Sequence, residues 1–270
     1  MAPPSDFPAL HVVQPTQDHH CTIIALHGRG SNGPEFAEEL FEDKSSNDLT
    51  FSEHFTHCKW IFPSSQERYS TVFQEEMDEW FDIYSLTDPS TQEELQVEGL
   101  RDSIKHILDI IDKEVELVLP GNIVLLGISQ GCATAIHALL AGQHRLGGFI
   151  GIAGWMPFRK HFVDLAGSRN DRASLSTFYA DTLGLTGASQ SNVCRSNPQQ
   201  NNVIPALLCH CTDDDVVDVE LGHQLRDALM SPGLDINVTY KEFVPGGHWI
   251  PCPDGFDSIV EFLRCRAFLS

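Results

Sequence analysis

Short, continuous apolar segments alternate with longer segments of helical periodicity along this chain of 270 residues. The apolar segments predict strands at 11–14, 22–26, 59–62, 122–128, 147–154, 204–210 and 236–243. Several are apolar throughout, as is expected of parallel strands that are covered on both faces. The predicted helices lie between them at 34–43, 92–117, 130–142, 218–230 and 256–268. This alternation favours an α/β fold with a mostly parallel central sheet and helices on both faces.

A polar segment interrupts the alternation between residues 159 and 204. It is rich in Ser, Asn, Gln and Arg, and its one apolar patch, LSTFYADTLGL at 175–185, predicts a single helix. We therefore expect one domain over residues 1–270 with an insertion at about 159–204. The insertion is interpreted either as a lid that alters substrate access or as an exposed surface excursion without a role.

The charge of the chain excludes some partners. Asp and Glu number 38 and Lys and Arg number 17, which gives a formal net charge of −21 at pH 7. Such a charge repels phosphate backbones and anionic lipid headgroups, so we expect no nucleic acid partner. Short acidic patches at 35–43 and 75–79 predict solvated helix and loop faces rather than binding sites.

Neither an export signal nor a membrane-spanning segment is predicted. The start, MAPPSDFPALHVVQ, has no basic segment followed by an apolar one, and no run approaches the roughly 18 apolar residues of a membrane span. We expect a soluble, cytoplasmic protein. The eight cysteines show no CxxC pair and no zinc-like spacing, so the sequence predicts free, mostly buried thiols and no metal site.

The segment GISQG at 127–131 follows the apolar segment NIVLL at 122–126. A residue at the tip of a sharp strand-to-helix turn has a strained backbone, and small neighbours are needed beside it. Gly127 and Gly131 supply that room around Ser129. We interpret Ser129 as a nucleophile; the alternative is an ordinary serine in a glycine-bounded turn.

A serine hydroxyl is a poor nucleophile at neutral pH and needs a base that is oriented by an acid. After such a turn the acid and then the histidine follow along the chain. His248 lies in VPGGHW, just past the last predicted strand, and is interpreted as the base. The acid is expected in TDDDVVD at 212–218, whose four aspartates the residues alone do not distinguish.

Hydrolysis also needs two backbone N–H groups that stabilise the developing oxyanion. Gln130 follows the nucleophile and provides the first, and Arg29, in LHGRGSNG at 26–33, provides the second. The alternatives for this glycine-containing segment are an ordinary turn or a phosphate loop. It lacks the lysine of a P-loop and the spacing of a dinucleotide fingerprint, so no nucleotide is expected. The chemistry requires no metal and no cofactor.

Six motifs in this order resemble those of the acyl-protein thioesterase, or phospholipase/carboxylesterase, family of α/β-hydrolases. The motifs are LHGRGSNG (26–33), WFDI (80–83), GISQGCA (127–133), GWMP (154–157), HCTDDDVV (210–217) and GGHW (246–249). The resemblance extends from about residue 20 to 268, apart from the insertion. It implies the α/β-hydrolase fold and cleavage of acyl esters or thioesters through an acyl-serine.

The resemblance also selects one acid. The family's catalytic aspartate is the fourth residue after the motif histidine, and counting from His210 gives Asp214. The resemblance implies in addition that Arg29 joins Gln130 in the oxyanion hole.

Four aromatic residues are predicted substrate contacts. WFDI and GWMP resemble the family segments that line or support the acyl channel, which makes Trp80, Phe81 and Trp155 candidates. Trp249 stands where the family has a small residue after the final histidine, so its ring is also expected near the site. The alternative for these aromatic side chains is packing in the core.

Other departures from the family pattern leave the triad intact and bear on the substrate. Cys211 replaces the glycine after the motif histidine, Thr212 an acidic residue, Asp215 a proline and Cys132 a common glycine.

The leading hypothesis is a serine hydrolase that acts as an acyl-protein thioesterase and removes palmitoyl groups from proteins. The alternative is a general carboxylesterase or lysophospholipase that acts on small or lipid esters. A more distant alternative is a related small fungal-type serine hydrolase of specialised metabolism. A further alternative keeps the fold as an inactive ligand-binding protein. Such hydrolases can form isologous homodimers, although no residue pattern here requires one.

Overall fold

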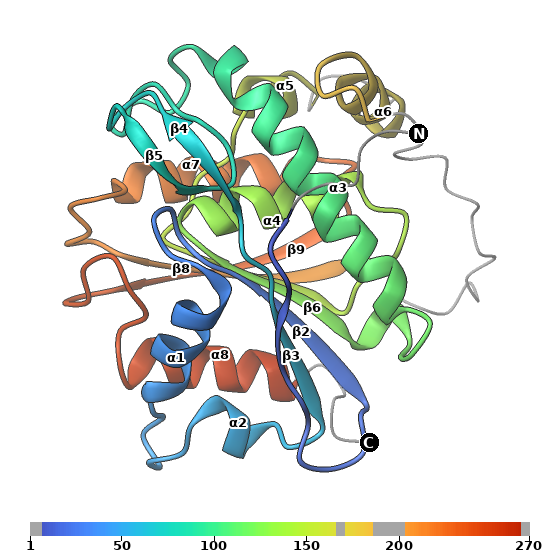
Figure 1. The fold of residues 1–270 in the computed structure, drawn as a ribbon, viewed down its shortest axis with the longest axis vertical. Helices are drawn as coiled ribbons and strands as arrows, with labels where there is room; N and C mark the ends of the chain where they lie inside the picture. The colour runs from blue at the N-terminus through green and yellow to red at the C-terminus, as the bar shows by residue number, and fades with distance from the viewer. Residues whose placement is uncertain (1–6, 166–170, 186–202, 266–270) are drawn as a thin grey trace.

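The computed structural model describes residues 7–165, 171–185 and 203–265. Its main sheet contains β1 His11–Val13, β2 Cys21–Leu26, β3 Cys58–Phe62, β6 Ile123–Ile128, β7 Gly148–Ile152, β8 Ile204–Cys211 and β9 Ile236–Phe243. The order is β1-β3-β2-β6-β7-β8-β9, and every pair is parallel except β1 with β3. These strands follow the predicted segments closely, and the mostly parallel sheet of the predicted α/β fold is confirmed (Figure 1).

Helices cover both faces of this sheet (Figure 1). One face packs against α1 Gly33–Glu42, α2 Phe51–His54 and α8 Asp254–Arg264, and the other packs against α3 Gln96–Glu114, α4 Gln130–Ala141 and α7 Val219–Leu229. Short 3₁₀ turns occur at η1 Glu93–Leu95 and η2 Pro120–Asn122. Because side chains alternate along a strand, Ile24 and Leu26 of β2 enter one buried cluster, while Ile23 and Ala25 enter the other. This explains why β2 is apolar throughout.

A two-stranded hairpin was not predicted. The strands β4 Gln66–Ser70 and β5 Glu75–Glu79 pair antiparallel to form a second, smaller sheet. The prediction of a solvated helix or loop face at residues 75–79 is wrong in its secondary structure and at Glu79, whose side chain is fully buried, whereas Glu75 and Glu76 are exposed. Cross-strand pairing with β4 and the turn of the chain into the body at Trp80 bury only the end of this charged segment.

Two helices lie in the described part of the insertion, α5 Arg159–Leu165 and α6 Asp171–Asp181. The single helix predicted at 175–185 begins earlier and has a partner before it. Tyr179 on α6 is fully buried, and its hydroxyl lies 3.1 Å from Nδ1 of His137 on α4. This part of the insertion therefore packs on the body. Residues 166–170 and 186–202 lie outside the described residues, and the lid remains a prediction, as does the single-domain organisation.

The prediction that all the thiols are free is wrong for one pair. Cys21 and Cys58 form a disulfide, and their Cα atoms lie 4.7 Å apart. The two residues are register partners on β2 and β3, which are adjacent in the sheet. The sequence places them 37 residues apart and does not reveal that register. Cys132, Cys209 and Cys211 are free and buried, as predicted.

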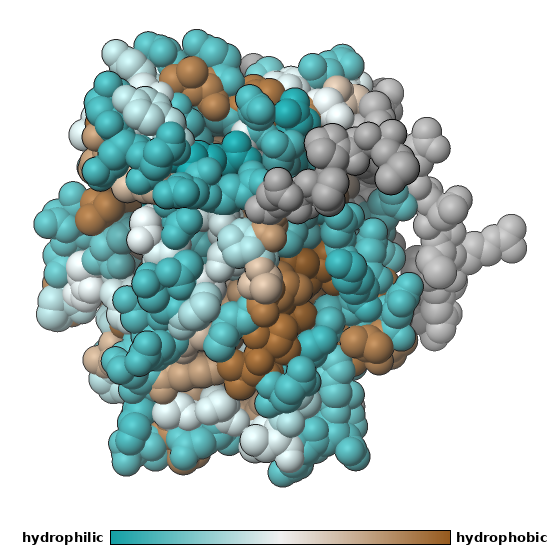
Figure 2. All heavy atoms as spheres, in the orientation of Figure 1, coloured by the Kyte–Doolittle hydropathy of each residue, from teal (hydrophilic) through white to brown (hydrophobic). Residues whose placement is uncertain are grey.

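The surface in view is mostly hydrophilic, with one elongated apolar area near the edge of the sheet (Figure 2). This agrees with the large excess of acidic residues in the composition. Among the described helices, none is long and apolar enough to cross a bilayer.

Candidate active site

Ser129 lies between β6 and α4 in the strained backbone that its flanking glycines predict. Its φ is 54° and its ψ is −124°, in a region that non-glycine residues rarely adopt. A Cβ on Gly127 would lie 2.5 Å from the carbonyl oxygen of Gly131, and a Cβ on Gly131 would lie 2.3 Å from that of Leu26. Only glycine fits at either position, so the turn can hold the serine at the carboxyl end of the sheet.

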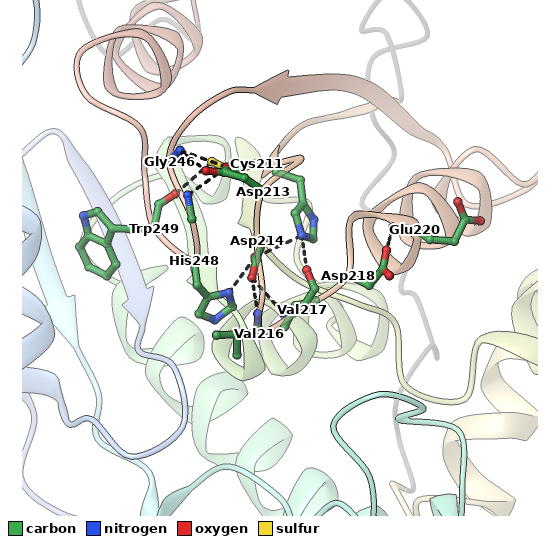
Figure 3. Close-up of polar contacts among 12 residues, drawn as sticks. Cys211, Asp213, Asp214, Val216, Val217, Asp218, Glu220, Gly246, His248 and Trp249 are labelled. Atoms are coloured by element: carbon green, nitrogen blue, oxygen red, sulfur yellow. Dashed lines mark hydrogen bonds and ion pairs between the residues drawn. The ribbon is translucent and has the colours of Figure 1, made fainter.

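Asp214 and His248 are brought together by the loops after β8 and β9. Nδ1 of His248 donates a hydrogen bond of 2.8 Å to Oδ2 of Asp214, whose side chain is fully buried (Figure 3). Of the four aspartates that the residues left open, Asp214 is the one that contacts the histidine. No hydrogen bond joins the described side chains of Ser129 and His248; such bonds commonly tighten only when substrate binds.

Hydrogen bonds keep Asp214 ionised. Burial alone would raise the pKa of this carboxyl, but donors from His210 and His248 and the backbone N–H groups of Val217 and Val216 hold the pKa below its usual range. Both N–H groups lie 2.9 Å from Oδ1. An ionised aspartate fixes the Nδ1–H tautomer of His248 and leaves Nε2 free to accept a proton.

His210 supports the acid, a role that the sequence did not reveal. Its Nε2 donates to the carbonyl of Val217 at 2.8 Å and lies 3.3 Å from Oδ2 of Asp214. Gly222 on α7 makes this possible, since a Cβ there would lie 2.4 Å from Nδ1 of His210. In the sequence, His210 served only as the motif histidine from which Asp214 was counted.

The loop that carries His248 is fixed on both sides of the histidine. Oδ1 of Asp213 accepts from the N–H groups of Gly246 at 3.1 Å and Gly247 at 3.2 Å. On the other side, Nε1 of Trp249 donates to Asp43 at 2.7 Å. Figure 3 shows the Trp249 ring directed away from the imidazole of His248.

The early glycine loop lies beside Ser129, where an oxyanion hole is expected. Gly28 is close enough that a Cβ on it would lie 3.5 Å from Cβ of Ser129. The N–H of Arg29 donates to no acceptor among the described residues. Gln130 is the first residue of α4, so its N–H has no acceptor within the helix and lies at the positive end of the helix dipole.

The predicted aromatic contacts divide into one that lines a cavity and three that do not. Trp155 lines a cavity of about 320 Å³ beside Ser129 and also an adjoining one of about 450 Å³. Trp80 and Phe81 are fully buried and bond through their backbones to the side-chain amide of Gln130, at 2.9 and 2.6 Å. They support the site from within the core. Trp249 packs edge-on against Phe36, with ring centroids 6.0 Å apart, outside the lining of both cavities.

Comparison with known families settles the wider relationship. Residues 8–177 match the family described as phospholipase/carboxylesterase. The chain belongs to this family. The match confirms the resemblance inferred from the six motifs, and family membership makes the protein a hydrolase.

Among curated proteins, this phospholipase/carboxylesterase family member is similar to acyl-protein thioesterase 1 from two yeasts. It is 33% identical to that of Schizosaccharomyces pombe over 153 residues, which cover 56% of this chain but only 63% of the yeast protein. It is 27% identical to that of Yarrowia lipolytica over 248 residues, 91% of this chain and 90% of that protein.

Solved structures give the same relationship for the fold. The crystal structure of Zea mays acyl-protein thioesterase 2 is 25% identical, with a TM-score of 0.67 that covers 96% of this chain and 98% of the maize protein. The Bacillus cereus carboxylesterase is 14% identical, with a TM-score of 0.59 that covers 97% of this chain and 96% of that one. At this low identity, the similarity to the Bacillus cereus carboxylesterase supports a shared fold and nothing about function.

Proposed function

We propose that the protein hydrolyses acyl esters or thioesters through an acyl-enzyme on Ser129. The observation that carries the proposal is the 2.8 Å hydrogen bond from Nδ1 of His248 to the buried carboxylate of Asp214, because it prepares Nε2 as a base. The strained backbone of Ser129 supports the role of nucleophile. Catalysis is assigned to Ser129, Asp214 and His248.

In the acylation step, Nε2 of His248 accepts the hydroxyl proton as Oγ of Ser129 attacks the acyl carbonyl carbon. The carbonyl oxygen becomes an oxyanion that accepts hydrogen bonds from the N–H groups of Arg29 and Gln130. The imidazolium then gives its proton to the departing thiolate or alkoxide, and the bond from carbon to the leaving group breaks. The product is an acyl ester on Ser129.

Deacylation repeats the sequence with water. His248 accepts a proton from the water as the water oxygen attacks the acyl carbonyl carbon, and the oxyanion forms again at the same two N–H groups. The bond from the acyl carbon to Oγ then breaks as the imidazolium returns the proton to Oγ of Ser129. The free acid leaves. Asp214 stabilises the imidazolium in both steps without itself taking the proton.

Acylated proteins are the leading substrates. The support is the similarity to proteins named acyl-protein thioesterases in two yeasts and in maize. The two adjoining cavities share Pro89, Trp155 and Leu221, and the second is also lined by the charged residues Asp88, Glu93, Arg159 and Lys160. A cytoplasmic location and a homodimer remain predictions. The Cys21–Cys58 disulfide weighs against a reducing compartment, because disulfides persist mainly in oxidising ones.

A carboxylesterase acting on small esters is the second candidate. One observation favours it: the lining of the cavity beside Ser129 includes the charged residue Arg29, which a long apolar acyl chain would not match.

Rates of hydrolysis of p-nitrophenyl esters from acetyl to palmitoyl test the proposal, with Ser129→Ala measured alongside. Activity that is absent in Ser129→Ala and holds or rises towards palmitoyl supports the thioesterase-like function. Activity confined to short chains selects the small-ester candidate. Activity that persists in Ser129→Ala, or a wild-type protein that neither hydrolyses these esters nor reacts with a fluorophosphonate, would reject the serine mechanism.

A further inference from the structure

The cavity beside Ser129 has the position of an acyl pocket. It is lined by Ser129, Arg29 and Gln130, which are the nucleophile and both oxyanion donors, whereas His248 is not among its lining residues. The leaving group must lie beside the general acid that protonates it. The part of the substrate that enters this cavity is therefore the acyl group.

Apart from Ser129 and Gln130, the residues that line this pocket are apolar with one exception. Ile83, Leu86 and Val216 are among the apolar lining residues, and Arg29 is the one charged residue in the lining. The Arg29 guanidinium carbon lies 4.8 Å from the centre of the Phe73 ring at the hairpin turn. One of its terminal nitrogens is buried and has no hydrogen-bond partner among the described residues. Such a donor gains from any acceptor that a substrate brings.

The acidic groups near Arg29 do not occupy that donor. Asp82 accepts hydrogen bonds from the N–H and hydroxyl of Thr71. Glu79 is fully buried, and neither of its carboxyl oxygens has a hydrogen-bond partner among the described residues. Burial and the charge of Asp82 raise the pKa of Glu79 to about 7, so near neutral pH this carboxyl is partly protonated and compensates Arg29 only in part.

We infer that Arg29 is a specificity-determining residue and that the acyl groups preferred by this pocket carry a carboxylate, as the monoesters and monothioesters of short dicarboxylic acids do. The inference rests on the proposed function of the site. It differs from a purely apolar acyl channel, which would exclude a charged acyl group because of the cost of desolvation. Here the guanidinium offers paired N–H groups that match a carboxylate.

Two esters of similar shape separate charge from size. Monoethyl glutarate carries a carboxylate where ethyl 5-methylhexanoate carries an isopropyl group, and the release of acid from each can be followed by titration at constant pH. The ratio of their kcat/KM values is the readout. Because both esters use the same backbone N–H of Arg29, a change in the oxyanion hole cancels in this ratio.

In the wild type we expect the ratio to favour monoethyl glutarate, and in Arg29→Met we expect it to fall by about tenfold or more, as for the loss of a charged hydrogen bond. Arg29→Lys should retain more of the preference than Arg29→Met. Arg68→Met is the matched control, since Arg68 lies on the hairpin whose turn residue Phe73 contacts Arg29, but does not line the cavity. Its ratio should equal that of the wild type.

The inference is overturned if Arg29→Met leaves the ratio within twofold of the wild type, or if Arg68→Met lowers it equally, which would indicate a general charge effect. Reaction of Ser129 with a fluorophosphonate without turnover of either ester would also overturn it, while the proposed function would stand. Neither labelling nor turnover would reject both.

Discussion

At the residue scale, single positions differ in how much their own sequence context reveals. Ser129 is marked by glycines that the turn requires, and His248 by its place after the last strand. Asp214 could be chosen as the acid only from the resemblance to the family, because three consecutive aspartates have the same chemistry. Glu79 could not be predicted at all, because nothing in EEMDE distinguishes the one buried carboxyl from its solvated neighbours.

Glu79 should make stability depend on pH. Burial and the charge of Asp82 raise its pKa from 4.5 to about 7, so the folded protein holds this proton more tightly than the unfolded chain does. The free energy of unfolding must then fall as the pH rises between these two values and level off above about 7. Glu79→Gln cannot ionise and should lack this fall, so the variant gains on the order of 1–3 kcal/mol relative to the wild type across the interval.

Urea unfolding of both proteins at several pH values between about 4 and 8 measures this difference. Glu76→Gln is a control, because Glu76 is exposed on the same strand. If the free energies of unfolding of the wild type and Glu79→Gln change with pH in parallel, the pKa of Glu79 is not raised in the folded protein.

Asp213 is expected to position the catalytic loop. Its carboxylate accepts hydrogen bonds from Gly246 and Gly247, directly before His248. Asp213→Ala should lower kcat about tenfold with little change in KM, because small displacements of a catalytic group slow chemistry more than binding. Asp213→Asn keeps an acceptor oxygen and should recover most of kcat.

Steady-state kinetics of the two Asp213 variants, together with their thermal midpoints, separate positioning from stability. If both variants lose kcat equally, or if Asp213→Ala keeps the wild-type kcat, the loop does not depend on this carboxylate.

At the scale of elements, apolar periodicity predicted the strands and helices that form because they bury apolar faces. It did not predict the hairpin and the disulfide, which depend on how strands pair. The seven strands of the main sheet and the helices α1, α3, α4, α7 and α8 follow apolar patterns, since each must bury one or both faces. The hairpin of β4 and β5 is charged, so its pattern resembles solvent-exposed structure. The partner of Cys21 depends on strand register, which separate segments do not encode.

The disulfide between β2 and β3 should contribute measurably to stability. It joins residues 37 apart, and a closed loop of that size restricts the unfolded chain by about 4 kcal/mol in the entropy model, of which about 2–4 kcal/mol is commonly realised. The double variant Cys21→Ala/Cys58→Ala should lose that much free energy of unfolding. Cys252→Ala/Cys265→Ala removes two exposed free cysteines and should change stability by less than about 0.5 kcal/mol.

Urea unfolding without reductant compares the two double variants. Thiol alkylation of the unfolded wild type should label two fewer cysteines without reductant than with it. Equal labelling in both conditions would show that the pair is not oxidised in the purified protein.

At the scale of the whole molecule, the fold places the three proposed catalytic residues at one end of the sheet. Ser129, Asp214 and His248 follow β6, β8 and β9, and these strands are parallel, so their carboxyl ends meet on one side. The protein has a net charge of −21, whereas Arg29 is the one charged residue in the lining of the pocket beside Ser129. The protein as a whole repels anions, and selection of an anionic acyl group therefore depends on local contact with Arg29 rather than on long-range attraction.

Detection of the acyl-enzyme would test most directly the proposal that Ser129 is the nucleophile. The protein is mixed with a p-nitrophenyl ester, quenched in acid within the first turnovers, digested and examined by mass spectrometry. We predict an acyl group on Ser129 in the wild type, little or none in His248→Ala, which lacks the base for acylation, and none on that peptide in Ser129→Ala. An acyl group on another residue, or full turnover by Ser129→Ala, would contradict the account.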